Sequence, residues 1–332
     1  MEKGSKLLTL LAIMGGIILG ISVNSTQPAC AKSPIKITKM SYNLKQSGNY
    51  VSFTGNNALY TKAAPLKGAK VVKTKQQLLE LNQSKAGQDT FMYLRSAYTN
   101  HHTVYYKVMS FDRKIKGWIY AGKISDIQSG LVHYAKDKKT VVGGINSFET
   151  LQNSPLNDLE KNEFYHLKYP GSKNNGSELL YQLPFWCGPD GKTKPNMKST
   201  IKYRHDVFII ENAMTRTREG DRWLVIHDLS NTNIVGYIKD GSLIPMHSVP
   251  ATEGITVNYV DKATNRPVKS VIVPFAKSPK QAGMNLKTSF FDYNGLPDGY
   301  TADDDSLGFK GNSATNAIKG ATLNYFIVKQ VK

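Results

Sequence analysis

Cysteine is nearly absent from this chain: its 332 residues include only Cys30 and Cys187. Because Cys30 falls within an N-terminal segment that we expect to be cleaved, the mature chain would retain a single thiol and could form no internal disulfide. Its folded parts must therefore be stabilised by buried apolar cores rather than by covalent cross-links.

Long apolar runs are absent after residue 31, so the sequence predicts no transmembrane anchor in the mature chain. The run that does occur, Leu7–Val23, follows Lys3 and Lys6 and precedes the small-residue site Ala29-Cys30-Ala31. This order is typical of a secretory signal peptide over residues 1–31. A retained anchor is the weaker alternative, because the run is short and contains glycines. Lipidation of Cys30 is weaker still, because Gln27 and Pro28 replace the apolar residues expected before a lipidated cysteine. A secreted chain with so little cysteine is typical of a Gram-positive bacterium.

Acidic residues are scarce at the start of the mature chain, where Lys32–Lys75 contains nine lysines and no aspartate or glutamate. Residues 32–150 hold 19 basic and six acidic side chains, against 12 and 11 in 151–250 and 10 and seven in 251–332. Such asymmetry favours a polyanionic partner at one end of the molecule, although a merely solubilising surface is the simpler alternative. Secretion argues against nucleic acid and for teichoic acid or another anionic cell-wall polysaccharide, bound with release of counterions.

No constellation of catalytic or metal-binding residues is convincing, so we predict a protein that is not an enzyme and uses no cofactor and no metal. Cys187 with His205 or His227 comes nearest to a nucleophile–base pair, but the cysteine lies in a Gly/Pro turn. The pair His101–His102 is expected to be solvated. Residues Asp303–Asp305 lack the Gly and Glu of a calcium-binding EF-hand loop.

The stretch from Val104 to Lys123 predicts a β-hairpin around which the first part of the chain is organised. Side chains alternate with a period of two over 104–111, a mostly polar run over 112–116 turns the chain, and Gly117–Tyr120 forms a second short strand. Gly117 leaves room for another backbone segment to approach closely.

A second copy of this pattern follows downstream, which indicates an internal repeat. Arg222–Ile226 corresponds to Val104–Val108, and Val235–Gly241 corresponds to Lys116–Gly122. The residues that we expect to form the structural core of the repeats are Tyr60, Tyr106, Gly117, Trp118, Trp223, Gly236 and Tyr237.

These segments resemble the cell-wall-binding repeats of S-layer proteins from lactic acid bacteria, which are SH3b-like and related in plan to GW modules. The residues that carry the resemblance are Asn57–Lys62, Leu66–Val72, Val104–Val108, Lys116–Tyr120, Thr215–Gly220 and Val235–Ile238. The hairpin turn departs from the Asp-Gly of that family, because Arg113 follows Asp112. The resemblance implies small β-barrel modules that attach a protein non-covalently to the cell wall.

Residues 255–330 resemble the β-grasp-like MucBP modules of surface adhesins, through Val257–Asp261, Gly299-Tyr300 and Leu323–Tyr325. We therefore predict a mainly β chain with two SH3b-like small β-barrel modules in tandem and a C-terminal β-grasp-like domain. The expected divisions are 1–31 for the signal peptide, 32–150 for a basic first module with its core at 57–124, 151–250 for a second SH3b-like module and 251–332 for the C-terminal domain.

Two sets of side chains in the first module are candidates for ligand binding. Lysine and arginine would neutralise the polyanion, and aromatic rings beside them would stack on sugar rings; for any single ring, a place in the core is the favoured alternative. The predicted cations are Lys62, Lys67, Lys70, Lys73, Lys75, Lys107, Arg113, Lys114, Lys116 and Lys123. The predicted stacking rings are Tyr98, Tyr105 and Tyr120, on the face opposite a core of Tyr60, Tyr106 and Trp118.

The sequence thus predicts a secreted, cell-wall-associated surface protein, S-layer-like or S-layer-associated, that binds anionic wall polymers through its basic modules. Host glycans or other surface proteins are further expected partners of the C-terminal domain. The alternative is a secreted cell-wall hydrolase or an adhesin in which the repeats only target the protein to the wall. A hydrolase would need a catalytic domain, and no unassigned stretch is long enough to hold one.

Overall fold

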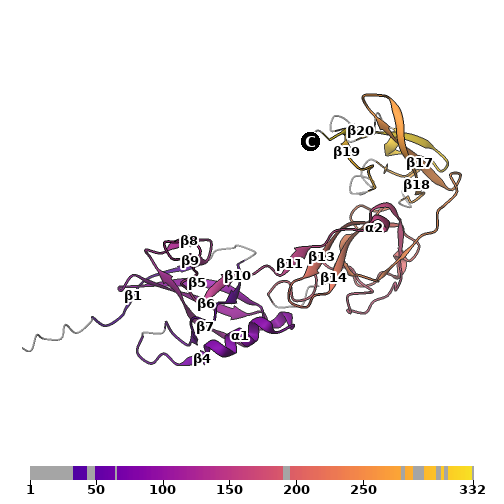
Figure 1. Cartoon of the computed structure of the whole chain (residues 1–332). Helices are drawn as coiled ribbons and strands as arrows, with labels where there is room; N and C mark the ends of the chain where they lie inside the picture. The colour runs from indigo at the N-terminus through magenta and orange to yellow at the C-terminus, as the bar shows by residue number, and fades with distance from the viewer. Residues whose placement is uncertain are drawn as a thin grey trace, which may run out of the picture. The chain divides into compact units, whose positions relative to one another are not determined.

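The structure is a computed structural model that describes residues 33–42, 49–63, 66–189, 195–277, 281–286, 295–303, 308–309 and 313–330. The predicted signal peptide lies outside the described residues, as do Asp304 and Asp305. The chain is mainly β, as predicted, and its described strands form four sheets (Figure 1). Among the described residues, no helix combines the length and the apolar character needed to span a bilayer.

The first sheet contains eight strands in the order β10-β2-β5-β6-β7-β3-β4, and β1 also pairs with β5. Helix α1, Lys75–Gln83, begins at a capping box in which the Thr74 side chain accepts a hydrogen bond from the Gln77 amide. Its buried residue, Leu78, packs into the core of this sheet. The strands are β1 Ile37–Tyr42, β2 Tyr50–Phe53, β3 Leu59–Tyr60, β4 Val71–Lys73, β5 Phe91–Thr99, β6 Thr103–Ser110, β7 Lys116–Lys123 and β10 Ile145–Ser147. A short 3₁₀ helix covers Gly87–Asp89, and a separate two-stranded sheet pairs β8 Ile127–Ser129 with β9 Val132–Tyr134.

The predicted hairpin is present as β6 and β7, which pair antiparallel with Val108 opposite Gly117 and Tyr106 opposite Ile119. Because side chains alternate along a strand, Tyr106 and Ile119 lie together in the main apolar core of the sheet. The opposite face carries a smaller apolar cluster. The first sheet therefore buries side chains on both faces, and the second of these faces forms the candidate site.

The second sheet has six strands in the order β15-β14-β13-β12-β16, with β11 also paired with β13. Ile226 stands opposite Gly236 in this sheet, as Val108 stands opposite Gly117 in the first sheet. The two copies of the repeat seen in the sequence therefore pair their hairpin strands in the same register. The strands are β11 Leu151–Asn153, β12 Tyr165–Leu167, β13 Phe208–Arg216, β14 Arg222–Asp228, β15 Val235–Lys239 and β16 Leu243–Pro245, with helix α2 at Asp158–Asn162 and a 3₁₀ helix at Ile201–Tyr203.

The last sheet has the order β18-β17-β20-β19, and its central strands β17 and β20 run parallel. The first and last strands of this segment are thus neighbours, as a β-grasp-like sheet requires. One hydrophobic cluster combines Phe164 and Ile209 of the preceding segment with Tyr259 and Ile327 of this one. The elements are β17 Gly254–Asp261, β18 Arg266–Pro274, β19 Tyr300–Ala302, β20 Thr322–Lys329 and a 3₁₀ helix at Ser313–Thr315.

The strand paths of the two repeats are open within the described residues, where a closed barrel was expected from the resemblance. The three larger sheets occupy residues 37–147, 151–245 and 254–329. We refer to these as the first, second and third segments. Their division into independently folding domains stays a prediction, since the second and third segments share an apolar cluster.

Candidate functional site

A row of four side chains crosses one face of the first sheet. Arg95 of β5 is opposite Lys107 of β6, Lys107 is opposite Trp118 of β7, and Trp118 is opposite Tyr60 of β3. Directly opposed residues on neighbouring strands project to the same face. Two cations and two aromatic rings are therefore brought side by side from four strands.

Gly117 allows β3 to approach β7 closely enough to complete this row. A Cβ atom at Gly117 would lie 2.8 Å from the carbonyl oxygen of Tyr60 and 2.6 Å from Cγ of Leu59. Both distances are too short for any side chain at this position. The two residues of the Gly-Trp pair thus have different roles. The glycine leaves room for the neighbouring strand, and the tryptophan ring forms part of the face that carries the row.

The two cations of the row both lie over the indole ring. The Arg95 guanidinium carbon is 5.4 Å and the Lys107 Nζ 5.8 Å from the Trp118 ring centroid, within the range of cation–π attraction. Burial lowers the pKa of Lys107, and the neighbouring charges of Arg95 and Lys116 lower it further. Mutual repulsion of this kind disfavours the positive charge until an anion binds between the cations.

A groove of about 190 Å³ opens beside this row. Its floor is apolar, because Ala63, Ala97 and Trp118 of the smaller apolar cluster are buried there. Its remaining lining residues are Ile37, Met40, Lys62, Leu66 and Arg95. The groove therefore combines an apolar and aromatic floor with cationic side chains, a combination suited to a sugar or polyol phosphate chain.

The predicted cations divide into those of the groove and those elsewhere. Lys62 lines the groove, Lys107 stands in the row and Lys116 lies close enough to Lys107 to affect its pKa. Arg113 and Lys114 are at the hairpin turn, where Lys114 pairs with Asp112 at 3.2 Å. The remaining predicted cations are exposed or half-exposed on β3–β4, α1 and the end of β7: Lys67, Lys70, Lys73, Lys75 and Lys123.

Arg95 was not among the predicted cations. It lies on β5, where a β-bulge between Tyr93 and Arg95 shifts the register. Without the extra residue at Leu94, Arg95 would not stand opposite Lys107. A basic residue inside an otherwise apolar and neutral strand was the signal that could have identified it.

The expected grouping of the aromatic rings is wrong in three respects. Trp118 does not share the main core with Tyr106; it lies on the opposite face with Tyr105 and Tyr120. Tyr60, which stands opposite Trp118, projects to that face as well. Tyr98 packs against the main core, on the side away from Tyr105 and Tyr120. The hairpin register causes the first difference, because Tyr106 is opposite Ile119 and not Trp118.

The burial of these rings limits which of them can stack on a sugar. The Tyr105 ring is 5% exposed and packs edge-on against Tyr120 at 5.6 Å between centroids, so its faces are covered. Burial raises the pKa of Tyr105 to about 12. Tyr120 and Tyr60 are half-buried and keep some surface accessible. Tyr98 also remains half-exposed, with Lys39 Nζ 5.7 Å from its ring centroid.

The second segment repeats the backbone plan but not the cations. The β-bulge recurs between Ile210 and Asn212, and the equivalent row reads Asn212, Val225, Tyr237 and Tyr181. A Cβ at Gly236 would lie 2.9 Å from the Tyr181 carbonyl oxygen, as at Gly117. Trp223 is fully buried and Tyr237 half-buried, in keeping with their predicted structural role.

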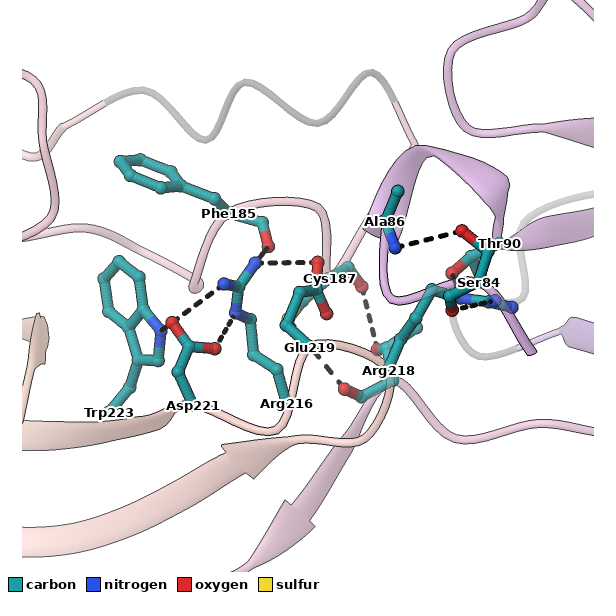
Figure 2. Close-up of polar contacts among 11 residues, drawn as sticks. Ser84, Ala86, Thr90, Phe185, Cys187, Arg216, Arg218, Glu219, Asp221 and Trp223 are labelled. Atoms are coloured by element: carbon teal, nitrogen blue, oxygen red, sulfur yellow. Dashed lines mark hydrogen bonds and ion pairs between the residues drawn. The ribbon is translucent and has the colours of Figure 1, made fainter. Parts of the chain in front are cut away.

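The basic segment Thr215–Gly220 of the second repeat is engaged in internal contacts (Figure 2). Arg216 is buried, and it donates to both carboxylate oxygens of Asp221 and, at 2.8 Å, to Glu219. Arg218 donates to Thr90 Oγ1 at 3.0 Å and to backbone carbonyl oxygens of residues 81 and 84. These two arginines therefore hold the structure together and are not presented to a ligand.

Cys187 is buried behind the same network, and burial raises the pKa of its thiol to about 12. Its carbonyl oxygen accepts a hydrogen bond from Thr150 Oγ1 at 2.9 Å. A thiol that stays protonated at neutral pH is a poor nucleophile. The structure therefore gives the suggested cysteine–histidine pair no chemical support.

Residues 41–125 match the GW (Gly-Tryp) dipeptide domain, with Gly117-Trp118 inside the matched range. The match covers 85 of the 332 residues. It indicates a cell-wall-associated binding protein whose first segment carries the GW-type repeat. No curated protein and no solved structure matches the chain.

Proposed function

We propose that the groove beside Arg95, Lys107 and Trp118 binds an anionic wall polymer of the teichoic acid type. The observation that carries this proposal is the cross-strand row, which sets two cations against one indole ring above an apolar floor. Phosphates of the polymer would lie between the cations, and its polyol or sugar units would contact the ring. Binding of this kind releases counterions and weakens steeply with salt.

The surrounding charge supports the same partner. The matched segment belongs to the most basic third of the chain, and its predicted cations outside the groove are exposed or half-exposed. They would attract the polymer at long range, while the groove supplies its short-range contacts. The protein is then a secreted, non-catalytic surface protein, S-layer-like or S-layer-associated, held on the wall without a covalent bond. Cleavage after residue 31 would place Lys32 at the mature N-terminus, which mass spectrometry of the secreted protein would reveal.

Sedimentation of the mature chain with isolated Gram-positive walls tests the proposal. We expect Arg95→Gln/Lys107→Gln to lose most of its binding to walls that retain teichoic acid. Lys85→Ala/Lys139→Ala removes the same charge from exposed sites of the same segment and should bind nearly as the unmodified protein does. Equal loss in both double variants would show general charge attraction in place of a groove. Binding to walls that retain teichoic acid would overturn the polyanion assignment if neither Arg95→Gln/Lys107→Gln nor high salt weakened it.

A further inference from the structure

The second segment presents a groove at the place where the first presents its cationic row. It has a volume of about 460 Å³, within the range of small-ligand sites. Tyr237, the equivalent of Trp118, lines it, and Val225 stands where the first segment has Lys107. The groove is completed by three amide side chains, Gln182, Asn196 and Asn233.

Among the residues that the structure describes, no charged side chain lines this groove. Two cations on the neighbouring strands β13 and β15 are engaged in other contacts: Arg216 is paired with Asp221 and Glu219, and Lys239 Nζ lies 5.9 Å from the Trp223 ring centroid. A polyanion needs cations to replace its counterions. The groove of the second segment therefore selects against the ligand that we assign to the first.

The lining instead matches a ligand rich in hydroxyl and amide groups. An Asn or Gln side chain both donates and accepts hydrogen bonds, as a sugar hydroxyl does. Asn196 Nδ2 donates to the Val235 carbonyl oxygen at 2.9 Å, and this bond fixes the amide at the groove wall. Gln182 and Asn233 are exposed, and the half-buried Tyr237 and Val225 offer apolar surface for the C–H face of a sugar ring.

We infer that this groove is a second binding site, specific for a neutral glycan. A stem peptide is the competing ligand on a bacterial wall, but its carboxylate and ammonium groups would find no opposite charge among the lining residues that the structure describes. The two repeats would then use one backbone plan to bind two wall components, one anionic through Lys107 and one neutral through Val225. This site does not depend on the polyanion site, and the two can be tested apart.

The probe is a preparation of Gram-positive walls stripped of teichoic acid and phosphate with hydrofluoric acid, presented to the mature chain at about 1 M salt, where the Debye length is about 3 Å. Gln182→Ala/Asn233→Ala alters two exposed side chains and should leave the fold intact. We expect it to weaken binding about tenfold, the effect of two lost hydrogen bonds. Val225→Lys places a cation at the position that Lys107 occupies in the first segment, and it should weaken binding to a similar degree. The matched control, Arg95→Gln/Lys107→Gln, should bind these walls as the unmodified protein does.

Three results would overturn the inference. The first is that the unmodified chain does not bind stripped walls. The second is that the Gln182/Asn233 double variant binds as the unmodified chain does, and the third is that the Arg95/Lys107 control loses binding. Competition with soluble stem peptide distinguishes the competing ligand. Binding that an excess of the peptide leaves unchanged supports the inference, and binding that the peptide displaces contradicts it.

Discussion

Gly117 and Gly236 occupy the same position in two hairpins. A Cβ atom added to either glycine would lie within 3 Å of a tyrosine carbonyl oxygen. In both hairpins an aromatic residue follows: Trp118 in the first and Tyr237 in the second. The backbone plan is thus conserved between the two repeats while the chemistry of the adjoining face differs.

Replacement of either glycine by alanine should destabilise its own segment. The new methyl group would overlap the tyrosine carbonyl, and backbone atoms yield less readily than a flexible side chain, so we expect a loss of about 1–3 kcal/mol in the free energy of unfolding. Chemical denaturation of Gly117→Ala and Gly236→Ala measures it. Gly188→Ala is the matched control, because the nearest neighbour of its Cβ is 3.9 Å away. Variants as stable as the control would contradict the close approach.

Arg113→Gly should stabilise the first segment by about 0.5–1 kcal/mol. Arg113 adopts φ = 63° at the turn between β6 and β7, a conformation that glycine adopts without strain. Asp112 Oδ1 accepts hydrogen bonds from the Ser110 hydroxyl and the Lys114 amide, so the turn is held without the arginine. Thermal unfolding of the variant, with Lys114→Gly as the control, provides the measurement. Equal or lower stability of Arg113→Gly would show that side-chain contacts of the arginine outweigh the backbone strain.

Loss of Arg216 should be among the most damaging single changes in the second segment. Arg216→Ala would leave the carboxylates of Asp221 and Glu219 without their buried partner, which typically costs about 3–5 kcal/mol. The exposed pair of Lys319 and Glu253, 2.6 Å apart, is the comparison, and Lys319→Ala should cost less than about 1 kcal/mol. Urea denaturation of both variants measures the two losses in the free energy of unfolding. Similar losses would mean that the buried network contributes no more than a surface ion pair.

The stability of the protein should fall as pH rises from about 4 to about 7. Burial, with the neighbouring carboxyl of Asp206, raises the pKa of Asp228 to about 7, although the Ser230 amide and hydroxyl both donate to its Oδ1 at 2.7 Å. The folded state therefore keeps a proton that the unfolded state releases, and this contribution is complete below pH 4 and lost through pH 7.

Asp228→Asn isolates this effect, because an amide resembles the protonated acid at every pH. The free energy of unfolding of the variant, relative to that of the unmodified protein, should increase between pH 4 and 7 and level off above. A constant difference across that range would show that Asp228 titrates normally. Guanidinium titrations at several pH values give the comparison.

Strand alternation predicted the hairpin, and the spacing of its aromatic residues predicted the repeat, because both depend on local sequence. The partners across strands could not be obtained in this way. The extra residue at Leu94 shifts β5 by one position, and only the paired sheet shows that Arg95 then meets Lys107. Likewise, Trp118 was expected to share a core with Tyr106, since sequence alone does not fix the register between β6 and β7.

The total charge of each repeat could be predicted from composition, but the positions and contacts of the charged side chains could not. Composition distinguished the basic first module from the nearly neutral second. It could not show that Arg216 and Arg218 of the second are buried in internal bonds, or that Lys107 and Val225 occupy equivalent positions. Those distinctions depend on tertiary contacts between residues far apart in the chain.

The most direct test of the central claim is the salt dependence of binding to purified, soluble teichoic acid. Affinities of the mature chain and of Arg95→Gln/Lys107→Gln would be measured by calorimetry across a salt series. If both cations neutralise phosphates of the polymer, the slope of log K against log salt should fall by about two in the double variant. An unchanged slope, with unchanged affinity, would show that the polymer binds elsewhere and that the row is not its site.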